Sequence, residues 1–214
     1  ADEHWVERTS EALQRHPLIH GFATVHELSR DASPDDPVSA PRLHSVRSMV
    51  RGLAEEVPAD SLKTGELRSK WGCTTGFSWA ARREVLEPGG LYDGMIIGGG
   101  DRTPMSAIKQ LGEQLRVFGR LNPVWYEHYR QWARRFVDRV DGPIGWLDTS
   151  IYHLWHGDLA NRYYTQRSVG FDAFAFDPNH DIAVDGGGCW RWASDKPKMH
   201  AYVERYFHSR REDG

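Results

Sequence analysis

The sequence predicts an α/β fold, with α+β as the alternative. Segments with the apolar period of helices are interspersed with short apolar stretches that are typical of buried strands. The chain has 214 residues, of which 39% are hydrophobic, and it contains nine Trp and eight each of Tyr and Phe. This length suits one domain, and the aromatic rings supply enough apolar area for a core without disulfides or metals. We therefore expect residues 1–214 to form a single domain.

The first part of the chain predicts a helix followed by a strand. Residues 3–17 carry apolar and small side chains at helical spacing, and a proline closes the segment. Residues 18–28 predict one buried strand. The next three segments predict a polar, proline-rich loop at 29–41, a helix at 42–57, and a loop with some helix at 59–76.

The middle of the chain predicts one strand and three helices. Phe77, Trp79 and Ala81 alternate as in a strand, and a short helix ends at the proline and glycines of residues 88–90. A helix at 103–121 has Thr103 as its N-cap, and one at 122–140 has Asn122 as its cap. The remaining segments predict a strand running into a loop at 142–157, a hairpin at 181–194 and an amphipathic helix at 196–212.

Composition narrows the setting of the protein. The net charge of −3 gives no reason to expect a nucleic-acid partner. The two cysteines, Cys73 and Cys189, make neither a metal motif nor a disulfide framework, so a reducing cytoplasm is the expected location. There is no apolar run long enough for a transmembrane segment, and the charged N-terminus is not a signal peptide.

Three glycines, Gly98 to Gly100, are followed by Asp101 directly before a predicted helix. The plain interpretation is a flexible turn. The spacing is not that of a dinucleotide fingerprint, and no P-loop lysine follows. The functional interpretation is that glycines let a ligand approach the backbone, while the helix dipole favours the charged carboxylate. A fixed carboxylate facing a substrate hydroxyl can act as a general base.

Residues 74–101, TTGFSWAARREVLEPGGLYDGMIIGGGD, resemble the acceptor half of glycosyltransferases with the GT-A fold. They are similar to the polypeptide N-acetylgalactosaminyltransferases, the β-1,4-galactosyltransferases and bacterial relatives. The family's Gly-Gly-Glu-Asp/Asn element corresponds to residues 98–101, with Gly100 in place of the glutamate. The resemblance therefore implies Asp101 as the catalytic base, and Trp79, Gly99 and Gly100 as substrate-binding residues.

Residues 152–167, YHLWHGDLANRYYTQR, resemble the later loop of the same families, which supplies a histidine ligand to a divalent metal, Mn²⁺ or Mg²⁺. The resemblance implies His156 as that ligand, with His153 as the alternative; both could also be ordinary loop histidines. Trp155 could close over a nucleotide sugar or pack in the core. Arg162 could pair with a diphosphate or make a surface salt bridge.

The resemblance is best over residues 70–170. The D-x-D metal-binding segment of these enzymes is not visible, so we expect the chain to be the acceptor-side and C-terminal portion of a catalytic domain, lacking the N-terminal nucleotide-binding strands. Such a portion would expose a sheet edge and an apolar face, which favours a homodimer. It would also bind a nucleotide sugar weakly by itself.

Two functions follow from these observations. The first is an inverting, metal-dependent glycosyltransferase that moves a sugar from a nucleotide-sugar donor, expected to be a UDP-sugar, to a carbohydrate or other hydroxyl acceptor. The second is a non-catalytic carbohydrate-binding or scaffold module derived from that fold. A zinc hydrolase is weakly supported, because no H-E-x-x-H or comparable set occurs.

Overall fold

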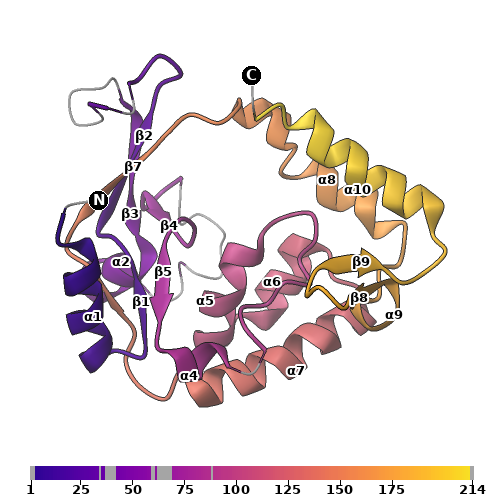
Figure 1. Cartoon of the computed structure of the whole chain (residues 1–214), viewed down its shortest axis with the longest axis horizontal. Helices are drawn as coiled ribbons and strands as arrows, with labels where there is room; N and C mark the ends of the chain where they lie inside the picture. Colours follow the sequence, from indigo (N-terminus) through magenta and orange to yellow (C-terminus); the bar gives the residue numbers. More distant parts are fainter. Residues whose placement is uncertain are drawn as a thin grey trace. The chain divides into compact units, whose positions relative to one another are not determined.

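The structure is a computed structural model that describes residues 3–33, 35, 36, 42–58, 61, 69–87 and 89–212. Helices occur together with parallel and antiparallel strand pairs (Figure 1), which confirms the α/β class in its general sense. The contacts divide the chain into two compact units. Unit 1 comprises Ala1–Gly90 and Phe136–Trp155, and unit 2 comprises Leu91–Arg135 and His156–Gly214.

Unit 1 contains two mixed sheets. The first has the strand order β5-β1-β6, with β1 antiparallel to β5 and parallel to β6. The second has the order β4-β3-β2-β7, with β2 antiparallel to β3 and parallel to β7. The strands are β1 (Leu18–His20), β2 (Thr24–Leu28), β3 (Arg42–Ser48), β4 (Cys73–Thr74), β5 (Trp79–Ala81), β6 (Gly145–Trp146) and β7 (Ser150–His153). The helices are α1 (Trp5–Arg15), α2 (Met49–Glu55) and α4 (Arg83–Leu86).

The single strand predicted at 18–28 is wrong, because the chain forms β1 and β2 in different sheets. Between them the backbone N–H groups of Gly21 and Ala23 donate to the carbonyls of Ser78 and Thr149 instead of continuing one ladder. Phe22 is fully buried there and packs with Val25 of β2. Burial of this side chain thus marks the crossing from one sheet to the other.

The prediction of a helix at 42–57 is also wrong for its first half, because residues 42–48 form strand β3. β3 pairs with β2 on one edge and β4 on the other, so sheet pairing overrides the local preference. Ser48 then caps α2 by accepting from the N–H of Arg51 at 3.3 Å. The predictions of helix α1 and of the short helix α4 are confirmed.

Unit 2 is mainly helical, with one antiparallel hairpin. Its helical elements are η1 (Gly100–Arg102), α5 (Thr103–Ile108), α6 (Gly112–Gly119), η2 (Leu159–Arg162), α8 (Gln166–Asp172), α9 (Pro178–Asp181) and α10 (Pro197–Ser209). The hairpin is β8 (Ile182–Val184) with β9 (Trp190–Trp192), as predicted, and α10 is confirmed as well. Helix α7 (Pro123–Arg139) begins in unit 2 and ends in unit 1.

The helix predicted at 103–121 is broken into α5 and α6. Gln110 has φ of 55°, a left-handed conformation that ends the first helix. The predicted N-cap is displaced by one residue: Arg102 is the cap, and Thr103 is the first helical residue, its hydroxyl donating to the Gly100 carbonyl at 2.7 Å. The cap of α7 is confirmed, because Asn122 Oδ1 accepts from the N–H groups of Val124 and Trp125, both at 3.0 Å.

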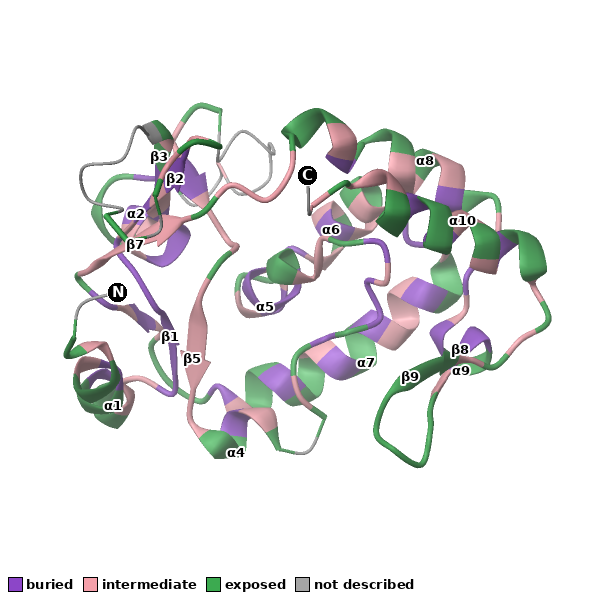
Figure 2. Cartoon of the chain, turned by 45° about the horizontal axis from the view of Figure 1, so that its top comes forward, coloured by how far each residue is buried: buried purple, intermediate pink, exposed green. Residues whose placement is uncertain are grey.

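Helix α7 is amphipathic along its whole length, as its alternating buried and exposed stretches show (Figure 2). Trp125, Tyr129, Trp132 and Phe136 are buried and recur at helical spacing. In unit 2, Trp125 packs edge-to-face on Phe176 at 5.0 Å between ring centroids. Among the helices described, none has the length and apolar character that crossing a membrane would require.

Candidate functional site

The glycine turn has a backbone that only glycine adopts readily. Gly98 and Gly99 have φ of 95° and 91°. The N–H of Gly98 donates to the Met95 carbonyl at 3.0 Å, and that of Arg102 donates to the Gly99 carbonyl at 3.2 Å. Ile97 is buried just before the turn, whereas Gly98 is exposed. The chain therefore leaves the interior here and reverses at the surface.

Gly98 also lies against the side chain of Arg167. A Cβ on Gly98 would be 2.9 Å from Arg167 Nη2 and 3.0 Å from Cζ. At Gly99 and Gly100 the nearest atoms would be 3.5 Å and 3.7 Å away, which is ordinary contact. Gly98 and Arg167 both belong to unit 2. The structure thus brings the end of the first resembling segment, at Gly98, against the end of the second, at Arg167, whereas residues 74–90 and 152–155 of these segments belong to unit 1.

Asp101 is exposed in the short helix η1, which runs directly into α5. The residue two positions after it is anchored in the interior. Thr103 is fully buried, and its carbonyl accepts from the Tyr129 hydroxyl at 3.3 Å. The predicted base is therefore a surface carboxylate on a firmly held backbone, next to the turn that touches Arg167.

The guanidinium of Arg167 lies close to two aromatic rings. Its Cζ is 4.9 Å from the centroid of Tyr164 and 5.5 Å from that of Tyr206. Nη1 donates to the Tyr206 hydroxyl. The Nε atom is buried and makes no hydrogen bond within the described residues. Arg167 is thus positioned mainly by ring contacts, and most of its N–H donors are not used inside the described chain.

His156 and Arg162 meet in a charged cluster with Glu212. Arg162 Nη2 lies 2.8 Å from His156 Nδ1, and Arg162 Nη1 is 3.0 Å from Glu212 Oε1. Arg210 also pairs with that carboxylate oxygen, and His156 Nδ1 lies 3.2 Å from it. Burial alone would raise the pKa of Glu212, but Arg210, Arg162 and His156 together lower it below its usual value. Arg162 itself is buried, with its terminal nitrogens engaged in this cluster.

This cluster does not fit a divalent cation as it stands. The imidazole that would be a ligand has a guanidinium at its Nδ1, and two arginines already neutralise the carboxylate. A hard cation would need several oxygen ligands in place of these positive charges. Within the part of the chain that the structure describes, no group of three His, Cys, Asp or Glu side chains could hold a metal ion. The predicted metal at His156 stays a prediction.

Three further predicted residues belong to unit 1. The ring of Trp79 stacks on His20 at 4.3 Å between centroids, so one of its faces is occupied. Trp155 is half-buried, with the Arg30 guanidinium 4.7 Å from its ring centroid. The ring of His153 meets Phe77 edge-to-face at 4.9 Å. Their roles as substrate-binding residues and alternative metal ligand stay predictions.

Phe77 has an unusual backbone. Its φ is 75°, which is rare for an aromatic residue. The residue is 37% exposed, although its ring contacts Phe22. The strand predicted from its alternation with Trp79 begins only at Trp79, because Phe77 lies outside the ladder.

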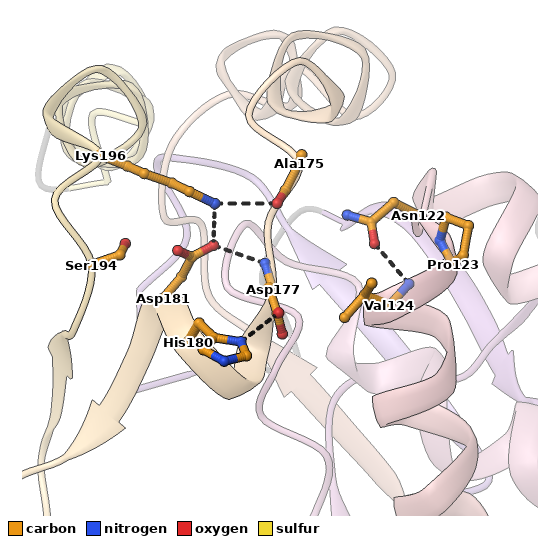
Figure 3. A pocket seen from close by; sticks show the side chains of 9 residues that line it. All are labelled: Asn122, Pro123, Val124, Ala175, Asp177, His180, Asp181, Ser194 and Lys196. Carbon is orange, nitrogen blue, oxygen red and sulfur yellow. Dashed lines mark hydrogen bonds and ion pairs between the residues drawn. The ribbon is translucent and has the colours of Figure 1, made fainter.

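A hollow of about 580 Å³ lies elsewhere in unit 2, at the start of α7 and around α9 (Figure 3). Its polar side chains contact one another: Lys196 Nζ forms an ion pair with Asp181 Oδ2 at 2.8 Å, and His180 Nδ1 lies 2.7 Å from Asp177 Oδ2. Lys196 also donates to the Ala175 carbonyl at 3.2 Å. None of the residues predicted to form the site lines this hollow.

Sequence reasoning missed Arg167, Tyr206 and Glu212. Arg167 is the last residue of the segment 152–167, and the only sequence signal near it is the aromatic pair Tyr163-Tyr164, three residues earlier. Tyr206 and Glu212 come from α10 and the residues after it, and only the fold brings them near. A comparison of the chain with protein-family models, with curated proteins and with solved structures finds no match.

Proposed function

We propose that the protein is an inverting glycosyltransferase related in architecture to the GT-A enzymes, or the acceptor-side part of one. The observation that supports it most is the contact between Gly98 and Arg167. Residues 98–101 of the first resembling segment and residues 156–167 of the second are far apart in sequence, yet both stretches belong to unit 2.

In this proposal Asp101 is the general base. Its carboxylate takes the proton of an acceptor hydroxyl, and the oxygen forms a bond to the anomeric carbon of the donor sugar. The bond from that carbon to the donor's phosphate oxygen breaks at the same time, and the nucleotide diphosphate leaves with the electron pair. Exposure of Asp101 at the surface allows an acceptor to reach it.

The nucleotide-sugar donor, with a UDP-sugar as first choice, and the hydroxyl acceptor both rest on the sequence resemblance. Arginine side chains of unit 2 are suited to neutralise a departing diphosphate, because a guanidinium binds phosphate oxygens through two parallel hydrogen bonds. No step of the proposal depends on a metal.

The test is an assay of transfer or hydrolysis with a panel of nucleotide sugars. The released nucleotide diphosphate is the quantity measured. Asp101→Asn keeps the shape and removes the basicity, so turnover should fall about a hundredfold or more. Asp138→Asn, an exposed carboxylate on α7, is the matched control and should leave turnover unchanged. Normal turnover in Asp101→Asn would remove Asp101 from the mechanism.

The same samples test the non-catalytic alternative. Saccharide binding by calorimetry, with no nucleotide released from any donor, would favour a carbohydrate-binding module. Nucleotide release that depends on Asp101 would exclude it.

A further inference from the structure

Unit 2 brings three arginines near α10 and only one carboxylate that pairs with them; Arg162 is buried, and Arg167 and Arg210 are half-buried. Arg162 and Arg210 share the single carboxylate of Glu212. Arg210 lies 5.9 Å from the centroid of the Tyr206 ring, which also contacts Arg167. We call these residues the arginine cluster: Arg162, Arg167, Arg210 and Glu212. Three guanidiniums with one carboxylate leave the cluster positive, in a chain whose net charge is −3.

Arg167 is the member whose charge has no carboxylate partner within the described residues. Arg162 and Arg210 each have an ion pair of 3.0 Å or less, whereas the polar contact of the Arg167 guanidinium is the Tyr206 hydroxyl. Nη1 makes that bond, and Nη2 makes no hydrogen bond within the described residues. The Nε atoms of all three arginines are buried and unpaired, so Nη2 is the donor that distinguishes Arg167.

The surroundings of Nη2 suit an oxyanion. The guanidinium lies against the exposed Gly98, where a Cβ would be 2.9 Å from Nη2, 3.0 Å from Cζ and 3.1 Å from Nη1, so only glycine leaves room for it. The contacts with Tyr164 and Tyr206 limit the orientation of the planar guanidinium. An oriented guanidinium edge binds two oxygens of a phosphate through parallel, charge-assisted hydrogen bonds.

We propose that Arg167, held between Tyr164 and Tyr206 against Gly98, binds a phosphoryl oxyanion, namely a diphosphate. Its identification as the diphosphate of a nucleotide-sugar donor rests on the proposed function. Arg162 is less suited to this role, because Glu212 and His156 already engage its terminal nitrogens.

The test is calorimetric titration with inorganic pyrophosphate in the presence of a chelator, so that no metal contributes. The unmodified chain should bind, and Arg167→Gln should weaken binding about tenfold to a hundredfold, the usual loss for a charge-assisted bidentate contact. Arg167→Lys keeps the charge without the planar edge, so it should recover part of the loss. Arg130→Gln, which removes an exposed arginine paired with Glu127, is the control and should bind as the unmodified chain does.

A second pair of variants tests the same site without changing Arg167, in case Arg167→Gln does not fold. Gly98→Ala and Gly188→Ala both place alanine at positive φ, 95° and 83°. Only the first would meet Arg167, since nothing lies within 4 Å of a Cβ at Gly188. Both should lose similar stability, and only Gly98→Ala should weaken pyrophosphate binding.

The outcomes separate this inference from the proposed function. Pyrophosphate binding that is absent, or within twofold of the unmodified value in Arg167→Gln, overturns the diphosphate site even if sugar transfer is found. Binding that depends on Arg167, without transfer from any donor, supports the site and removes the glycosyltransferase. Titration with UDP and inorganic phosphate shows which kind of molecule supplies the oxyanion. Tighter binding of UDP than of pyrophosphate supports a nucleotide. Equal binding of phosphate and pyrophosphate overturns the assignment to a diphosphate.

Discussion

His20 is a fully buried histidine held in one tautomer. Its Nε2–H donates to the Gly76 carbonyl at 2.9 Å, so its Nδ1 accepts from the Ser48 hydroxyl at 2.8 Å. Burial lowers the pKa of His20 to about 4, and the carbonyl contacts oppose this only in part. The ring is therefore neutral in the folded state at neutral pH, and it links β1 to Ser48, the end of β3 and the cap of α2.

The protonation of His20 should make stability depend on pH. The unfolded chain takes up a proton near pH 6.5 and the folded chain only near pH 4, so the unfolded state binds more protons between these values. The stabilising contribution is thus complete above about pH 6.5 and lost as the pH falls to about 4, by about 3 kcal/mol in all. Urea unfolding at several pH values should show this loss in the unmodified chain and much less in His20→Gln.

The control for this experiment is His4→Gln, because His4 is exposed near the start of the same unit. This variant should keep the pH dependence of the unmodified chain. An equal slope in His20→Gln and the unmodified chain would contradict the buried, neutral state of His20.

At single residues the sequence indicated where the backbone is closely approached, but not which side chains approach it. The glycines before Asp101 indicated a close approach to the backbone, and Gly98 does make one. What approaches is Arg167, whose distance in sequence hides the contact. Similarly, the motif that contains His156 was visible, whereas Glu212 reaches it from the residues after α10.

At the level of elements, predictions succeeded where capping and periodicity agreed. Helix α7 has an asparagine cap, a proline at its first position and a regular apolar stripe, and it forms as predicted. The predictions failed where long-range pairing decided the structure, as in β3, or where a left-handed residue such as Gln110 breaks a continuous apolar pattern. Neither cause can be read from local composition.

The cap of α7 should be a measurable part of the stability of unit 2. Asn122 Oδ1 accepts two backbone hydrogen bonds, and its Nδ2 donates to the Phe176 carbonyl at 2.8 Å. Asn122→Ala should cost about 1–2 kcal/mol in the free energy of unfolding. Asn122→Asp keeps the cap acceptor and loses only the donor, so it should cost less. Denaturant unfolding measures both, and equal losses would assign the effect to the Phe176 contact instead of the cap.

For the whole molecule, α7 is the element that both units share. Its first part packs in unit 2, where Trp125 contacts Phe171 and Phe176. Its last turn belongs to unit 1, where Arg139 Nε donates to the Val85 carbonyl at 2.9 Å. The boundary between the units falls inside the helix, after Arg135. One continuous helix thus contributes residues to both units.

This continuity predicts that breaking α7 at the boundary weakens both units. Arg135 is exposed, so replacing its side chain removes little packing. Arg135→Pro should interrupt the helix at a cost of about 3 kcal/mol or more, whereas Arg135→Ala should have little effect. Hydrogen exchange followed by mass spectrometry should show faster exchange in Arg135→Pro both in unit 1 peptides that contain β1 and β2 and in unit 2 peptides that contain α8 and α10. Faster exchange confined to the helix and one unit would show that the two units are stable independently, and that α7 connects them without coupling their unfolding.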